Sequence, residues 1–316
     1  MDKVQRADLA LADLTANGGV LDPEHQNTFF RKIIDEPTVI KQVRQQQMGA
    51  PEMRIPKIGF GSRVLRPAPN TGQGGFDDTN NNDRYLAAAL RAKPDFGQVE
   101  LKTTEYIAEI HLHDDLLEDN IEKEAMADTI MTLLAERVAL DLEELLILGD
   151  KGMLAGLDPD GYLRTADGIL KMANANIVDA NAAPVSINVY NDMKKAMPTR
   201  YRRNLSTLRY LNSMDVESDY RVQVAARGTA LGDAILTGSA PLPVLGTPLQ
   251  GVALMPETSG LLIDPKNVIF GIQRNVRIER QRDIRARSWI IVLTMRVGFA
   301  IEEKEAIVRL DDLGAA

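Results

Sequence analysis

Two histidines separated by one residue stand beside two aspartates in the run HLHDD at His111–Asp115. Imidazole and carboxylate groups are the usual ligands of a catalytic zinc ion. Side chains alternate along a strand, so His111 and His113 would point the same way as Glu109 and Ile107. This spacing therefore allows a metal-dependent hydrolase built on His111 and His113.

The rest of a zinc site is missing from the sequence. The run resembles the His-x-His-x-Asp-His pattern of metallo-β-lactamase-type hydrolases, but Leu116 holds the last ligand position and no histidine follows His113. The chain has no cysteine, which excludes thiolate ligands and disulfides. We therefore favour a half-buried strand that leads into a helix, and we expect no metal and no cofactor. The buried face of this strand would hold Tyr106, Ala108, Ile110 and Leu112.

The composition excludes several other classes of protein. The 316 residues are 44% hydrophobic and 26% charged, with a net charge of −8, which makes the chain a poor general nucleic-acid binder. No apolar run is long enough to span a bilayer, and acidic residues near the N-terminus argue against a signal peptide, so we expect no membrane association. The P-loop and nucleophile-elbow patterns are absent, and nothing else in the sequence indicates an enzyme.

The first third of the chain predicts an arm followed by a hairpin. The segment 1–50 is a polar, helical N-terminal arm, with Phe29 and Phe30 on its apolar stripe. An edge strand follows, then a Gly- and Asn-rich tip at 67–83, and then a returning strand from Gln98 to His113. Because an isolated hairpin is marginally stable in water, we expect a partner to support it.

A long helix is the strongest local prediction. Apolar residues recur at helical spacing from about 119 to 148, and Gly149 is a natural stop. The region 166–265 mixes short helices, strands and proline-rich extended segments, and the chain closes with three or four alternating strands.

Two arginine clusters and two arginines beside the hairpin tip are candidate contacts. Because the chain is acidic, we favour ion pairing within or between subunits over phosphate binding. Together with the two arm phenylalanines, the candidate inter-subunit contacts are Phe29, Phe30, Arg63, Arg66, Arg200, Arg202, Arg203, Arg277, Arg280 and Arg282.

The order of these elements resembles the major capsid proteins of tailed bacteriophages, which have the Hong Kong 97-type fold. EIHLHDDLLEDN leading into the long helix, LLILGD at its end, and PVLGTPLQGVALMP carry the resemblance. The closing stretches IFGIQRNVRIERQRD and TMRVGFAIEEKEAIVRL extend it to most of the chain. Encapsulin-type nanocompartment shells resemble the same fold and remain the alternative to a phage capsid.

The resemblance implies an α+β subunit that is structural rather than enzymatic. It would have an extended hairpin loop at 51–100, a peripheral domain at 101–165 and 266–316 built on the long spine helix, and an axial domain at 166–265. Such subunits form pentamers and hexamers of an icosahedral virion shell, assembled in the bacterial host cytoplasm around double-stranded DNA that they contact non-specifically. Portal and scaffolding proteins, and in some cases a decoration protein, are the implied partners.

Two features depart from some members of that family. The arm starts almost at Met1, so a scaffolding segment has been removed or a separate scaffolding protein is needed. Lys57, Lys93 and Lys102 lie in or near the hairpin, but no partner for a lysine–asparagine crosslink is evident, and we predict none.

Overall fold

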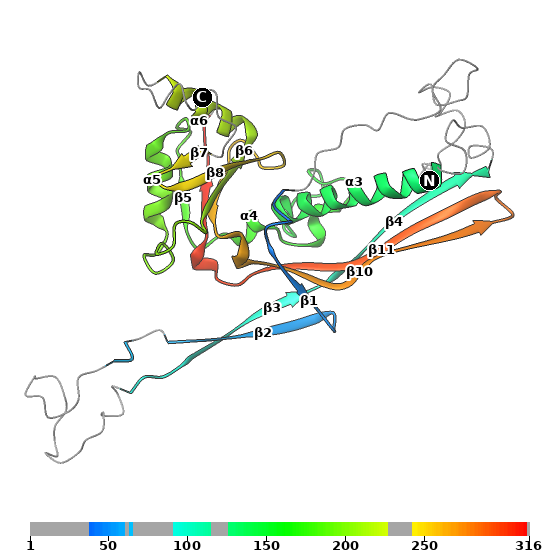
Figure 1. Cartoon of the computed structure of the whole chain (residues 1–316), viewed down its shortest axis with the longest axis horizontal. Helices are drawn as coiled ribbons and strands as arrows, with labels where there is room; N and C mark the ends of the chain where they lie inside the picture. Colours follow the sequence, from blue (N-terminus) through cyan, green and yellow to red (C-terminus); the bar gives the residue numbers. More distant parts are fainter. Residues whose placement is uncertain (1–37, 61–62, 66–90, 115–125, 227–241, 315–316) are drawn as a thin grey trace, which may run out of the picture.

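The computed structural model describes residues 38–60, 63–65, 91–114, 126–226 and 242–314. The molecule is elongated: helix α3 lies along a long sheet, a second sheet with two helices forms one end, and a two-stranded hairpin projects away from both (Figure 1). None of the described helices is long and apolar enough to cross a membrane.

The first sheet has four strands in the order β1-β10-β11-β4. A long antiparallel ribbon, β10 and β11, forms its centre; β4 pairs with β11, and β1 pairs in parallel with the beginning of β10. The bounds are Arg44–Gln47 for β1, Thr104–His113 for β4, Val268–Asp283 for β10 and Ser288–Ile301 for β11.

Helix α3, Met126–Leu148, covers one face of this sheet. It ends before Gly149, as predicted, while residues 119–125 of the predicted helix lie outside the described chain. Its buried side chains belong to the same apolar cluster as alternate residues of β11, which confirms the helical and strand periodicities. The cluster includes Val138, Leu142, Leu146, Leu293, Met295 and Val297.

The second sheet has six strands in the order β5-β12-β9-β6-β8-β7. Helices α5 and α6 share one face of it, where the Tyr190 ring meets those of Tyr210 and Tyr220 at centroid distances of 4.9 and 5.1 Å. The strands are β5 Ile177–Asp179, β6 Arg209–Ser213, β7 Leu242–Val244, β8 Thr247–Val252, β9 Gly260–Ile263 and β12 Val308–Asp311. The helices are α4 Ile169–Met172, α5 Ile187–Ala196 and α6 Met214–Ala225, with short 3-10 turns at Leu163–Thr165, Pro265–Asn267 and Lys304–Ala306.

The hairpin consists of β2, Glu52–Gly59, and β3, Asp95–Lys102, paired antiparallel. The predicted hairpin is therefore confirmed for its two strands, and its tip at 67–83 lies outside the described residues. Pro56 lies in β2, which pairs only with β3 among the described strands, in keeping with its inability to donate to a second ladder.

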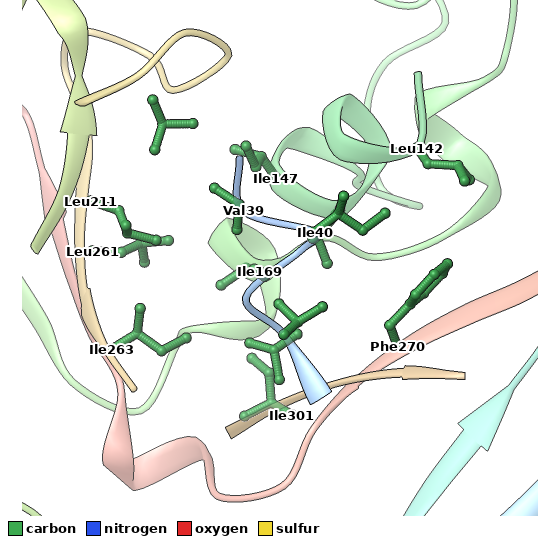
Figure 2. Close-up of a cluster of buried hydrophobic side chains, with 14 of the residues drawn as sticks. Val39, Ile40, Leu142, Ile147, Ile169, Leu211, Leu261, Ile263, Phe270 and Ile301 are labelled. Carbon is green, nitrogen blue, oxygen red and sulfur yellow. The ribbon is translucent and has the colours of Figure 1, made fainter. Parts of the chain in front are cut away.

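Residues 38–43 fill the junction between the two sheets. Val39 and Ile40 lie between α3, the second sheet and the ends of β10 and β11 (Figure 2). The end of the N-terminal arm is thus part of the main core. Burying these side chains requires both sheets, so this short segment couples them.

Three predicted boundaries were wrong. Residues 44–47 form strand β1 instead of continuing a helical arm to about 50, because their backbone pairs with Ile269–Ile272 of β10. The single strand predicted from 98 to 113 is divided at Thr103, where the chain leaves β2 and joins β11. Residues 308–311, assigned to the peripheral domain, pair with β5 and β9 of the second sheet.

Candidate assembly surfaces

His111 and His113 lie on the outer face of β4, opposite Ile290 and Ser288 of β11. Nε2 of His111 is 2.6 Å from Oε1 of Glu109. The prediction that these two side chains lie on the same face of the strand is therefore confirmed. Leu112, on the other face, is fully buried. Across the described part of the chain, no three His, Cys, Asp or Glu side chains gather in a way that could hold a metal ion. The geometry supports a polar strand face.

Replacing both histidines with glutamine is expected to leave assembly near neutral pH intact, because glutamine keeps a polar side chain of similar reach on this face. Electron microscopy of the His111→Gln/His113→Gln protein, beside the unchanged protein, measures this. Failure of only the variant to form particles would show that this face is an interface.

The base of the hairpin is fixed to the outer face of the first sheet. Val99 and Leu101 of β3 pack with Met48, Ile269 and Ala300 in a separate apolar cluster. Two glycines allow the close approach. A Cβ on Gly298 would lie 2.0 Å from the carbonyl oxygen of Lys102, and one on Gly271 would lie 2.5 Å from Leu101.

A second contact holds the hairpin farther along β2. Nζ of Lys57 donates to the carbonyl oxygen of Glu302 at 2.6 Å and lies 3.3 Å from a carboxylate oxygen of Glu303. Glu302 also pairs with Arg44 at 2.7 Å. The hairpin therefore leaves the body of the molecule in a defined direction.

Beyond these contacts the hairpin exposes large apolar side chains. Ile58 and Phe96 are directly opposite each other across the two strands and are 69% and 70% exposed. Phe60, Val64 and Leu65, which follow β2 in the sequence, are also exposed. Large exposed apolar side chains on a thin ribbon are typical of a surface that another molecule covers.

The candidate inter-subunit contact residues fall into three groups. Phe29, Phe30 and Arg66 lie outside the described residues. Three arginines form ion pairs within the chain: Arg200 with Glu305, Arg277 with Glu279 and Arg282 with Asp114. The others, Arg63, Arg202, Arg203 and Arg280, form no ion pair with any described residue. Arg280 and Arg282 share one face of β10, as the alternation predicted, opposite Ile291 and Trp289.

Sequence reasoning missed Glu105, which joins two arginines on the outer sheet face. Arg274 and Arg296 are opposite each other on β10 and β11, and both bond the Glu105 carboxylate from β4. The hydrogen bond from Arg296 outweighs the opposing effect of burial and, together with the bond from Arg274, lowers the pKa of Glu105 below its usual value of 4.5. Only the strand register brings these three residues together.

Glu143 was also missed, although it lies within the predicted helix. It is 3% exposed, and its Oε1 accepts from the backbone N–H of Val39 at 3.0 Å and the Thr38 hydroxyl at 3.2 Å. The sequence did contain an indication: Glu143 is an acidic residue among the apolar residues predicted to form the buried face of the helix, such as Leu142 and Leu146. Its partners, about a hundred residues earlier, were not predictable.

A model of the phage capsid family matches residues 17–312. The chain belongs to the phage capsid family. The putative prophage capsid protein YqbE of Bacillus subtilis (strain 168) is 37% identical over 319 residues, which cover 97% of this chain and 96% of that protein. Family membership makes this chain a capsid shell protein and a component of the virion.

Solved capsid structures share the fold. The capsid of the native GTA particle has a TM-score of 0.63 at 17% identity, covering 98% of this chain and 100% of that chain. A solved structure of Mycobacterium phage Che8 has a TM-score of 0.63 at 10% identity, covering 93% of this chain and 98% of that chain. The satellite phage P4 procapsid, which includes its size determination (Sid) protein, gives 0.62 at 12% over 88% of each chain. The predicted α+β, Hong Kong 97-type capsid fold is confirmed.

Proposed function

We propose that this protein is the repeating subunit of an icosahedral phage head, that it forms pentamers and hexamers, and that the head encloses double-stranded DNA. The exposed apolar pair Ile58 and Phe96 supports this most directly, because a two-stranded hairpin gains stability only when another surface covers it. In this proposal the hairpin of one subunit lies over its neighbour. Many repeated contacts then make the shell cooperative.

The domain organisation of the subunit is part of the same proposal. The four-stranded sheet and α3 form the peripheral domain, and the six-stranded sheet, including β12, forms the axial domain around the capsomer axis. The subunit has no catalytic role and needs no cofactor. It works with portal and scaffolding proteins in the bacterial cytoplasm, with a decoration protein as a further candidate partner and with non-specific contacts to the packaged DNA.

Electron microscopy of the purified protein, with and without candidate scaffolding proteins and across salt and pH, tests the proposal. We expect closed shells built of five- and six-membered rings. Monomers under every condition would contradict it. A small uniform shell that holds protein cargo and no DNA would instead identify an encapsulin-type compartment.

The hairpin contact has its own test. Ile58→Ser with Phe96→Ser is expected to abolish shell formation while changing the free energy of unfolding of the unassembled protein by no more than about 0.5 kcal/mol, since both side chains are exposed. Sedimentation and urea unfolding measure the two effects.

The matched control changes the exposed cross-strand ion pair of the same hairpin. Arg54→Ser with Glu100→Ser removes a 3.3 Å pair on β2 and β3 and should leave assembly largely intact. Equal loss of assembly in both double variants would mean that the hairpin was generally disturbed and that the apolar pair has no special role.

A further inference from the structure

Helix α6 has an outward face that carries acids beside apolar side chains. Asp215 and Asp219, one helical turn apart, are exposed, and neither pairs with a described residue. Met214 and Val222 are also exposed, at 58% and 64%. We call these four residues the acidic face. Glu217, in contrast, is bonded at 2.7 Å by Arg221 of the same helix.

A cavity of about 280 Å³ opens at the beginning of α6, next to the acidic face. Met214, Leu140, Leu254 and Glu143 line it. The second carboxylate oxygen of Glu143, Oε2, is buried and accepts no hydrogen bond from the described residues. The acidic face therefore borders a hollow lined mainly by apolar side chains, with one buried carboxylate among them.

The loop before β6 carries the opposite charge. Arg202 donates to the Thr199 hydroxyl at 3.2 Å, while its buried Nε has no acceptor among the described residues. Arg203 is exposed and forms no ion pair with them. We call Arg202 and Arg203 the arginine pair. Burial of Lys194 and, to a smaller extent, the nearby charge of Arg202 lower the pKa of Lys194, so a third basic side chain lies close to the arginine pair.

The two surfaces lie at opposite ends of strand β6. The arginine pair precedes Arg209, where the strand begins, and α6 starts at Met214, directly after the strand ends at Ser213. Five residues of strand span about 16 Å at about 3.3 Å per residue. The charges therefore face different flanks of the six-stranded unit. A surface that contacts a different surface of an identical copy makes a head-to-tail interface, which closes into a ring when the rotation allows it.

We propose that the arginine pair of one copy docks on the acidic face of the next copy. This proposal rests on the proposed ring-forming function and names the partner surfaces within it. Opposite potentials on the two flanks select the head-to-tail order and disfavour contacts between like flanks.

Charge reversal tests the contact. Asp215→Lys with Asp219→Lys, and separately Arg202→Glu with Arg203→Glu, are each expected to raise the protein concentration needed for ring formation by about tenfold or more, because like charges then face each other. A chain that carries all four substitutions should recover ring formation. Native mass spectrometry counts the subunits in each ring, and circular dichroism confirms that each variant is folded.

Mixing the two double variants gives a second readout. In an equimolar mixture, every contact is complementary only when the two variants alternate around the ring. Alternation is possible with six members and impossible with five, so the mixture should restore hexamers and no pentamers. The control, Asp160→Lys with Glu257→Lys, changes the charge of two other exposed acids by the same amount and should assemble normally.

Several outcomes would overturn the contact while leaving the shell function intact. One is normal ring formation by either folded double variant. Another is failure of the folded fourfold variant to recover. Arg203→Glu alone, at the more exposed of the two arginines, should show a smaller loss than the pair, and no loss at all would also count against the contact. If the unchanged protein forms no rings under any condition, the proposed function fails first.

Discussion

Gly298→Ala is expected to destabilise the unassembled protein by about 3 kcal/mol and to abolish shell assembly. The added Cβ would lie 2.0 Å from the carbonyl oxygen of Lys102 and 2.8 Å from its carbonyl carbon. Both atoms belong to the backbone, so no side-chain rotation can relieve the overlap. The base of the hairpin must move off β11, which opens the apolar cluster that holds Leu101 and Ala300.

Urea unfolding measures the loss of stability, and hydrogen exchange of the β3 amides shows whether the hairpin base has separated. The matched control is Gly59→Ala, at the far end of β2, where an added Cβ meets nothing within 4 Å. We expect the control to change the free energy of unfolding by no more than about 0.5 kcal/mol and to assemble. Similar unfolding midpoints for the two variants would show that the hairpin base tolerates displacement.

The hairpin junction shows what could be predicted from the sequence and what could not. Alternation identified both strands, but the buried positions change phase at Thr103: Val99 and Leu101 are buried before it, and Leu112 after it. This change of phase is visible in the sequence and marks the point where one strand becomes two. Gly298 interrupts the alternating run of β11, and a glycine within a strand is a sequence feature that accompanies a close backbone approach, although it was not among the sequence predictions.

Other features left no local signal. Strand β1 has the sequence RQQQ, without apolar alternation, and exists because its backbone pairs with β10. The assignment of β12 to the second sheet depends on partners from β5 and β9, far away in sequence. Long-range pairing decides both cases, and a single sequence records side-chain preference more clearly than pairing partners.

The candidate surfaces divide in the same way. The arginine clusters were evident as residue types, but the register decided that Arg277 pairs with Glu279 on its own strand while Arg274 and Arg296 share Glu105. The exposed pair Ile58 and Phe96 required the hairpin register as well. Composition therefore identified which residues could make contacts, and topology determined which of them are already used within the subunit.

Glu143→Ala is expected to lower the free energy of unfolding by about 3 kcal/mol, because it leaves the buried N–H of Val39 without an acceptor and removes a charge-assisted hydrogen bond. Val39 and Ile40 occupy the core between the two sheets, so releasing this turn weakens the junction as a whole. Glu143→Gln keeps an acceptor oxygen on the same stem and should lose only about 1 kcal/mol. Equilibrium urea unfolding of the unassembled protein gives both values.

The control is Glu144→Ala, one residue along the same helix and half-buried, with no hydrogen bond to a described residue. It should change stability by about 0.5 kcal/mol or less. Hydrogen exchange separates the local effect from the global one, since the Val39 amide should lose protection in Glu143→Ala before the amides of α3 do. Equal destabilisation by the alanine variants at 143 and 144 would mean that any substitution in this part of α3 lowers stability to the same extent. The anchoring of the arm at Glu143 would then contribute nothing measurable.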